Sequence, residues 1–155
     1  MEISDYTVHD AVGISDLIRR REISVREACE AALSMHARTD PAITAVIETW
    51  DDDIDGAIAA SPRTAPFHGV PFMVKDMVLT VEGKRAESGS RLAAGLVAPH
   101  DTELMRRFRS AGLITLGRCK TPELGSSSAT EPVLHGPARN PWNPARSAGG
   151  SSGGT

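Results

Sequence analysis

Two stretches of the sequence contain side chains that could carry out acid–base or nucleophilic chemistry. The first is the apolar run 69–74, which is followed directly by Lys75. The second is the segment 147–155, in which Ser151 and Ser152 lie between two pairs of glycines. Burial disfavours the charged form of a lysine, and a neutral lysine can activate a serine hydroxyl. The two stretches predict a serine–lysine site, although their spacing alone does not bring them together.

The glycine–serine segment also allows two other interpretations. Residues 149–155 have the spacing of a phosphate-binding loop, but glycine stands where that motif requires lysine. The pattern Gly-x-Ser-x-Gly of α/β-hydrolases fits around both Ser151 and Ser152. That pattern follows a strand and precedes an acid and a histidine. Because the proline-containing segment 143–146 is not expected to form a strand, both interpretations are weak.

Composition narrows the class of protein. A chain of 155 residues with 40% apolar residues fits one domain with a real core. A net charge of −3, with 19–21 as the longest basic run, argues against nucleic-acid binding. The acidic segment 1–5 lacks the apolar region of a signal peptide, and no apolar run is long enough for a membrane span. Cys29 and Cys119 lack metal-ligand spacing and suit a reducing compartment, so we expect a cytoplasmic protein.

An acidic cluster invites a calcium-binding interpretation. Asp51, Asp53 and Asp55 alternate, and Gly56 falls at the position of the central glycine of an EF-hand loop. The twelfth position is Pro62 instead of the closing glutamate. We therefore interpret the cluster as the start of a helix and predict no metal site.

Helices and strands are expected to alternate along the chain. Capping patterns at Thr7/Asp10 and Ser24/Glu27 predict two short surface helices, the second ending at 40–41. The apolar stripes expected on these two helices are Val8, Ala11, Val12, Leu17 and Ile18, and Ala28, Cys29, Ala32 and Leu33.

Strands are expected at 43–47, 69–74 and 113–116, with the second buried on both faces. A helix capped by Asp101 should end at Gly112. The apolar side chains expected on one face of this helix are Leu104, Met105, Phe108 and Ala111. The alternation predicts an α/β fold, with helices on the faces of a sheet.

Two segments are expected to lack regular structure. Residues 80–98 should form a long loop. Residues 121–155 contain five prolines and few apolar residues, so this segment should be loop-rich and functional or disordered. His100 and His135 are interpreted as ordinary surface histidines.

Several motifs resemble the amidase signature family. Residues 69–76, Gly-Val-Pro-Phe-Met-Val-Lys-Asp, and residues 149–155, Gly-Gly-Ser-Ser-Gly-Gly-Thr, are similar to its two hallmark segments. Further similar stretches lie at 117–125, 130–132 and 136–143. The resemblance implies an α/β domain around a twisted mixed sheet flanked by helices, of which residues 1–155 are the N-terminal portion.

The resemblance also implies a Ser-Ser-Lys mechanism of carboxamide hydrolysis. In it Lys75 is the base, and Ser151 is a bridging serine joined to Gly150 by a cis peptide. The attacking serine lies about two dozen residues further along in the family, as the end member of the relay. Since the sequence ends at Thr155, we expect an inactive fragment. The expected substrate-binding residues are Gly125, Ser128, Thr130 and Ser152, and Lys120 stands where relatives commonly carry asparagine.

The predicted function is hydrolysis of linear or cyclic carboxamides, without a cofactor. The expected partner is a small-molecule amide, with no nucleic acid and no membrane, and a homodimer is possible at full length. The alternative within the family is the A subunit of a glutamyl/aspartyl-tRNA amidotransferase, which would need partner subunits and a source of ammonia. An alternative of another class is a truncated fold fragment without catalytic activity.

Overall fold

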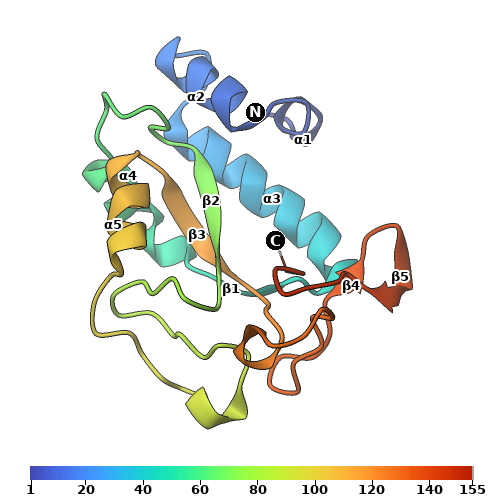
Figure 1. The fold of residues 1–155 in the computed structure, drawn as a ribbon. Coiled ribbons are helices and arrows are strands. Elements are labelled where there is room, and N and C mark those ends of the chain that lie inside the picture. The colour runs from blue at the N-terminus through green and yellow to red at the C-terminus, as the bar shows by residue number, and fades with distance from the viewer. Residues whose placement is uncertain (155) are drawn as a thin grey trace. The chain divides into compact units, whose positions relative to one another are not determined.

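The computed structural model describes residues 1–154, which form a mixed α/β structure as predicted. Its helices and strands are α1 (Ile3–Tyr6), α2 (Ala11–Arg19), α3 (Val25–Ile43), β1 (Val46–Thr49), α4 (Ile54–Ala60), β2 (Pro71–Lys75), α5 (Glu103–Ser110), β3 (Ile114–Cys119), β4 (Arg139–Asn140) and β5 (Asn143–Ser147) (Figure 1).

The contacts divide the chain into two compact units. The first contains Met1–Arg38, Trp50–Phe72 and Arg106–Leu116. The second contains Thr39–Thr49, Met73–Met105 and the chain from Gly117 onward. Both β2 and β3 therefore begin in the first unit and end in the second.

The main sheet has the strand order β1-β3-β2 and is mixed. Strand β1 pairs antiparallel to β3, with Glu48 opposite Arg118. Strands β2 and β3 run in the same direction, because the Ile114 N–H donates to Val70 O (2.9 Å) and the Asp76 N–H donates to Cys119 O (3.0 Å). The strand buried along its whole length is β3, whereas only Val74 of β2 is buried. The expectation that β2 is buried on both faces was therefore wrong.

The apolar core of the first unit contains Ile14, Ile18, Ala28 and Val70. The stripe predicted on the first helix was displaced, because Val8 and Val12 are 76% and 57% exposed. Its cap is Asp10 rather than Thr7: Asp10 Oδ1 accepts the Gly13 N–H at 2.8 Å. The helix begins at Ala11, which places Ile14 and Ile18 on the buried face.

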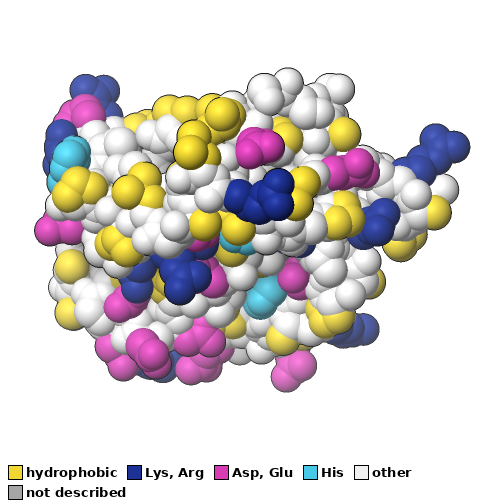
Figure 2. Space-filling model, turned by 90° about the horizontal axis from the view of Figure 1, so that it is seen from below, with side chains coloured by type: hydrophobic (Ala, Val, Ile, Leu, Met, Phe, Trp, Pro, Cys, Tyr) yellow, Lys and Arg dark blue, Asp and Glu magenta, His cyan; other side chains and the backbone are white. Residues whose placement is uncertain are grey.

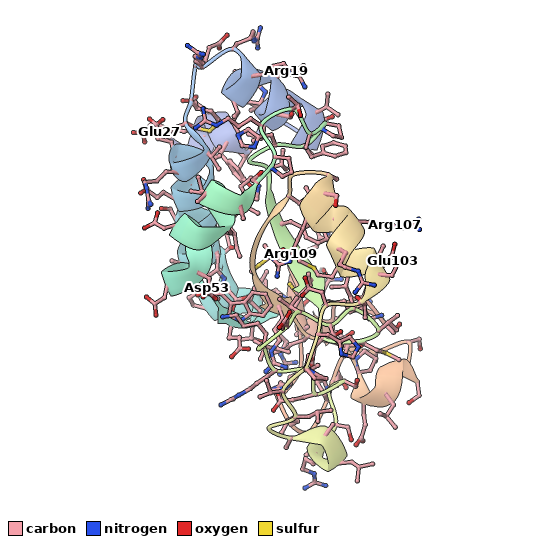
Figure 3. All side chains as sticks on the ribbon, turned by 90° about the vertical axis from the view of Figure 1, so that its left-hand side faces the viewer. Arg19, Glu27, Asp53, Glu103, Arg107 and Arg109 are labelled. Carbon is pink, nitrogen blue, oxygen red and sulfur yellow. The ribbon has the colours of Figure 1, made fainter. Side chains whose placement is uncertain are left out.

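The capping box of α3 is confirmed. Ser24 Oγ accepts the Glu27 N–H at 3.1 Å, and Glu27 Oε2 accepts the Ser24 N–H at 2.7 Å. Glu27 is labelled near the start of this helix in Figure 3. The hydrogen bond from the Ser24 backbone holds the pKa of Glu27 below its ordinary value. On the inner face Ala28, Cys29 and Ala31 are buried, so Ala31 replaces the expected Ala32 and Leu33.

We expect Ser24→Ala to lower the free energy of unfolding by about 1 kcal/mol, because the first turn loses a side-chain acceptor. Ser34→Ala, an exposed position inside the same helix, is the matched control. It should be neutral or slightly stabilising, since alanine has the higher helix propensity. Urea unfolding of the two variants measures the difference, and equal midpoints would contradict the assigned cap.

The far end of α3 differs from the prediction. The helix continues through Pro41 to Ile43 instead of ending at 40–41. The Asp40 carboxylate accepts the N–H groups of Ala45 (2.7 Å) and Val46 (3.0 Å), which ends the helix and starts β1. Proline is tolerated because Pro41 is exposed in the last turn, where water can satisfy the freed carbonyl. The strand predicted at 43–47 therefore begins three residues later.

The next two helices confirm one prediction and correct the apolar stripe expected in another. The acidic cluster starts a helix, as a 3₁₀ turn over Asp51–Asp53 that leads into α4. The Asp101 carboxylate accepts the Glu82 N–H at 2.7 Å, and Thr102, the residue directly before α5, accepts the Met105 N–H with its Oγ1 at 3.4 Å. On α5, Met105 is fully buried, whereas Leu104 is 46% exposed, against the predicted stripe.

Residues 121–154 consist mainly of loops, as predicted, but they include the β4–β5 hairpin. The expectation that 143–146 is not a strand was wrong. Asn140 Oδ1 accepts the Trp142 N–H at 2.9 Å and forms the turn, and Asn140 pairs with Asn143. Proline is compatible with a strand of an isolated two-stranded ribbon, where one side has no ladder partner.

The mixture of charged side chains on the surface agrees with the small net charge of the sequence. On the face shown in Figure 2, Lys and Arg side chains are interspersed with Asp, Glu and apolar side chains. In the described part of the chain, none of the helices has the length and hydropathy needed to cross a lipid bilayer.

Candidate active site

The second unit brings together the lysine and the serines that the sequence singled out. Lys75, the last residue of β2, is half-buried, and its Nζ donates to Ser151 Oγ at 2.8 Å. The same nitrogen donates to Ser152 Oγ at 3.2 Å. At an N–O separation of 2.8 Å a neutral lysine amine can accept the hydroxyl proton, and the ammonium that results can return it. The arrangement is therefore a serine hydroxyl held against a potential base.

Two buried threonines hold the glycine–serine loop in place. Thr121 Oγ1 donates to the Ser151 carbonyl at 3.1 Å. Thr130 N–H donates to Gly149 O at 2.8 Å, and Thr130 Oγ1 accepts the Gly153 N–H at 3.2 Å. Both threonines are fully buried. The peptide bond between Gly150 and Ser151 is cis, as the resemblance implies.

The glycines of the loop are required by close packing. A Cβ at Gly153 would lie 2.4 Å from Gly149 O and from Thr130 Oγ1. A Cβ at Gly150 would lie 2.9 Å from Ser127 O. The loop can approach the 127–130 segment only because these side chains are missing.

We expect Thr130→Val to lower the free energy of unfolding by about 1–3 kcal/mol, because the Gly153 N–H then has no acceptor from this side chain. Thr64→Val, at an exposed position, is the matched control and should change stability little. Thermal unfolding of both variants measures the effect. A Thr130→Val protein as stable as the control would show that this bond does not hold the loop.

The predicted substrate-binding residues have different surroundings. Ser128 and Ser152 are exposed, and Ser152 is also close to Lys75. Gly125 has φ +65, and a Cβ there would lie 2.4 Å from Met77 Sδ. Thr130 is fully buried, with its hydroxyl bonded to the loop. A role of these four residues in substrate contact stays a prediction.

Lys120 is buried next to the glycine–serine loop. It is 6% exposed, and its Nζ donates to Pro137 O at 3.4 Å. Its backbone carbonyl accepts the Gly154 N–H at 3.2 Å. Burial lowers the pKa of Lys120, although the nearby Asp40 carboxylate acts in the opposite direction. The backbone of Lys120 thus holds the end of the glycine–serine loop through its bond to Gly154.

A buried arginine next to the site was missed by the sequence analysis. Arg118 is 1% exposed and bonds three carboxylates: Glu48 (Nε, 2.8 Å), Asp76 (Nη1, 2.8 Å) and Glu87 (Nη2, 2.6 Å). Asp76 is thus paired with Arg118, whereas the hydrogen bonds of Lys75 go to Ser151 and Ser152. The sequence did contain one signal for it: Arg118 is a charged residue in the continuation of the apolar strand expected at 113–116, where charge is rarely buried without a partner. We call Arg118, Glu48, Asp76 and Glu87 the Arg118 network.

The network stabilises the charged form of its members. Desolvation alone would lower the pKa of Arg118, but its hydrogen bonds with Glu87 and Asp76 and their charges raise the pKa overall. Desolvation alone would raise the pKa of Glu87, but the bonds from the Gly95 N–H and from Arg118 lower it overall. Both groups therefore remain ionised while buried.

His135 is not the ordinary surface histidine that was expected. Its side chain is 15% exposed, and its Nε2 lies 3.2 Å from Glu87 Oε2 and 3.9 Å from Asp76 Oδ2. Desolvation lowers its pKa, against the pull of Glu87. One ligand atom each of His135, Asp76 and Glu87 lies within 4.8 Å of the others, a spacing that a metal ion could use. Because Arg118 already bonds both carboxylates, we assign them to the network instead.

A cavity of about 690 Å³ lies elsewhere, in the first unit. Charged side chains from the end of α2 and the start of α3, among them Arg19, Arg26 and Glu27, line it together with Arg63 and His68. The side chains predicted to do chemistry belong to the second unit, so this cavity is not assigned to them.

Comparison with known proteins gives one family model, described as Amidase, that matches residues 24–155. The chain is 36% identical over 160 residues to the A subunit of the glutamyl-tRNA(Gln) amidotransferase of Acidothermus cellulolyticus, covering 99% of the chain and 32% of that relative. It is 37% identical over 148 residues to 6-aminohexanoate-cyclic-dimer hydrolase of a Pseudomonas species, covering 94% and 30%.

A solved structure of 6-aminohexanoate cyclic dimer hydrolase complexed with substrate superposes with a TM-score of 0.89, at 37% identity. The match covers 94% of this chain and 30% of that structure. The chain thus spans about a third of the length of the curated relatives it matches.

Proposed function

Because this chain belongs to the amidase signature family, we propose that residues 1–155 are the N-terminal portion of a single amidase domain that hydrolyses carboxamides. In this proposal Lys75 is the general base and Ser151 is the bridging serine. The observation that carries it is the 2.8 Å bond between Lys75 Nζ and Ser151 Oγ. The attacking serine is supplied by chain that follows the printed sequence.

The proposed steps conserve every proton. The neutral Lys75 amine accepts the proton of Ser151, while Ser151 accepts the proton of the attacking hydroxyl. The hydroxyl oxygen forms a bond to the amide carbon, and the protonated lysine returns a proton by the same route to the leaving nitrogen as the C–N bond breaks. Water then hydrolyses the resulting ester in the same way, without a cofactor.

We infer that the substrate is a small linear or cyclic amide. One of the relatives described above is a cyclic-dimer hydrolase by name, and a structure of such an enzyme contains its substrate. Gly125, Ser128, Thr130 and Ser152 remain the proposed substrate-binding positions. A cytoplasmic location is supported by the free, buried thiols of Cys29 and Cys119, and a homodimer of the whole protein is part of the same proposal.

A second candidate is the A subunit of a tRNA-dependent amidotransferase. It is favoured by the 36% identity to such a protein over 99% of the chain. Both candidates use the same lysine and serines. They differ in the molecule that accepts the acyl group, or in the molecule that accepts the ammonia released.

The test is to express the whole reading frame that contains these residues and to measure amine or ammonia release from a panel of linear and cyclic amides. An amidase should release amine from at least one of these amides without any partner. An amidotransferase component should instead hydrolyse glutamine only with its partner subunits and charged tRNA. A folded protein with neither activity would support the non-catalytic alternative and contradict both proposals.

A further inference from the structure

Asp76, the residue after the proposed base, is fixed by hydrogen bonds of its backbone and of its side chain. The Asp76 backbone N–H donates to Cys119 O at 3.0 Å, which continues the pairing of β2 with β3. Its Oδ1 accepts the Glu87 N–H at 2.9 Å, and its Oδ2 accepts the Gly89 N–H at 3.0 Å. Asp76 is 3% exposed. The backbone one residue after Lys75 is therefore fixed by both its main chain and its side chain.

Arg118 joins this position to three other segments. Its Nη1 bonds Asp76 Oδ1 at 2.8 Å, its Nη2 bonds Glu87 Oε2 at 2.6 Å and its Nε bonds Glu48 Oε1 at 2.8 Å. Planar guanidinium is the side chain suited to several carboxylates at fixed angles. The network thereby ties the end of β2 to β1, β3 and the 80–98 loop.

The same chain segments hold the serine loop. Two positions after Arg118, the backbone of Lys120 bonds Gly154, and the next residue, Thr121, bonds the Ser151 carbonyl. Residues 118–121 therefore contact both Asp76, which follows Lys75, and the loop that contains Ser151. A shift of this segment would change the distance between Lys75 Nζ and Ser151 Oγ.

We propose that the Arg118 network positions Lys75 against Ser151 and so sets the rate of proton transfer. This inference rests on the proposed function. Asp76 and Arg118 are positioning residues here, since they act through Lys75 and do not touch the reacting atoms.

A buried ion network is by itself weak evidence of a stabilising role. Buried ion pairs lose much of their attraction to desolvation, and well-packed apolar side chains often replace them without loss of stability. What a network of directional bonds adds is a single fixed geometry. Proton transfer demands this geometry, since a displacement of about 1 Å can slow a reaction by about 100-fold.

The test uses the whole protein with Asp76→Asn, which keeps the shape of the side chain but removes one carboxylate acceptor. We expect kcat to fall by about 10- to 100-fold with KM changed by less than about 3-fold, because substrate binding does not use the network. A crystal structure of the variant should show the Lys75 Nζ–Ser151 Oγ distance lengthened beyond about 3.5 Å. Glu131→Gln, an exposed carboxylate in the same unit, is the matched control and should leave kcat and the distance unchanged.

A second variant, Glu87→Gln, removes an acceptor at another arm of the same guanidinium and should reproduce the fall in kcat. The proposal is overturned if both folded variants keep the wild-type kcat and the 2.8 Å distance. It is equally overturned if both variants lose only folded protein, with normal kcat per folded molecule, since the role is then purely structural. Full activity of Lys75→Ala would instead contradict the proposed function, while the Lys75 Nζ–Ser151 Oγ distance in the Asp76→Asn and Glu87→Gln structures would still test the positioning role.

Discussion

Lys75→Ala in the whole protein is expected to lower kcat for amide hydrolysis by about 10³-fold, within the range for loss of a general base. KM should change little, because the proposed role of Lys75 lies in proton transfer and not in binding. The reason is the bond of 2.8 Å to Ser151, which leaves the serine without its proton acceptor when the amine is removed. Steady-state kinetics on the best amide of the panel measures the effect.

The matched control for this prediction is Lys84→Ala, which removes another half-buried lysine of the second unit. It should keep kcat within about 3-fold, as surface substitutions usually do. If the two variants have the same kcat, Lys75 is not the base. Circular dichroism of both variants separates a loss of chemistry from a loss of fold.

Gly154→Ala is expected to have the largest effect on stability, of about 3 kcal/mol. A Cβ at this position would lie 2.4 Å from the Lys120 nitrogen, 2.6 Å from Ala45 O and 2.8 Å from Lys120 O. All three atoms belong to the backbone, so no side-chain rotation can relieve the contact. The variant should also lose the 3.2 Å bond from the Gly154 N–H to Lys120 O, which anchors the serine loop.

Gly56→Ala is the matched control for this substitution. Gly56 lies inside α4, and a Cβ there would meet no atom within 4 Å. It should stabilise the protein by about 0.5–1 kcal/mol, because alanine loses less conformational entropy in a helix. Urea unfolding compares the two, and equal destabilisation by both substitutions would contradict the packing described for the loop.

Local chemistry made part of the fold predictable. Ser24 and Glu27 form their capping box because both partners lie within four residues. The alternation of helices and strands likewise predicted a mixed α/β structure. Pro41 was misleading because its effect depends on exposure in the last turn of α3, which a local pattern does not contain. The β4–β5 hairpin was missed because its turn depends on Asn140 and on a ribbon with a free edge.

The candidate site was predictable in its residue types and not in its supports. A lysine after an apolar strand and serines among glycines have a recognisable chemistry, and the family resemblance supplied their pairing. The supports come from distant positions: Thr121, Thr130 and Arg118 act through contacts that join residues far apart in the sequence or through buried charge. No periodic pattern contains such contacts, so the partners of Arg118 and the place of His135 beside them became visible only in three dimensions.

The most direct test of the central claim is the turnover of Lys75→Arg in the whole protein. Arginine keeps the positive charge and a long side chain, but guanidinium stays protonated and cannot accept a proton from Ser151. The account predicts that Lys75→Arg is as inactive as Lys75→Ala, because neither side chain can accept the proton of Ser151. Near-normal turnover of Lys75→Arg would show that Lys75 is only a structural cation and would contradict the proposed mechanism.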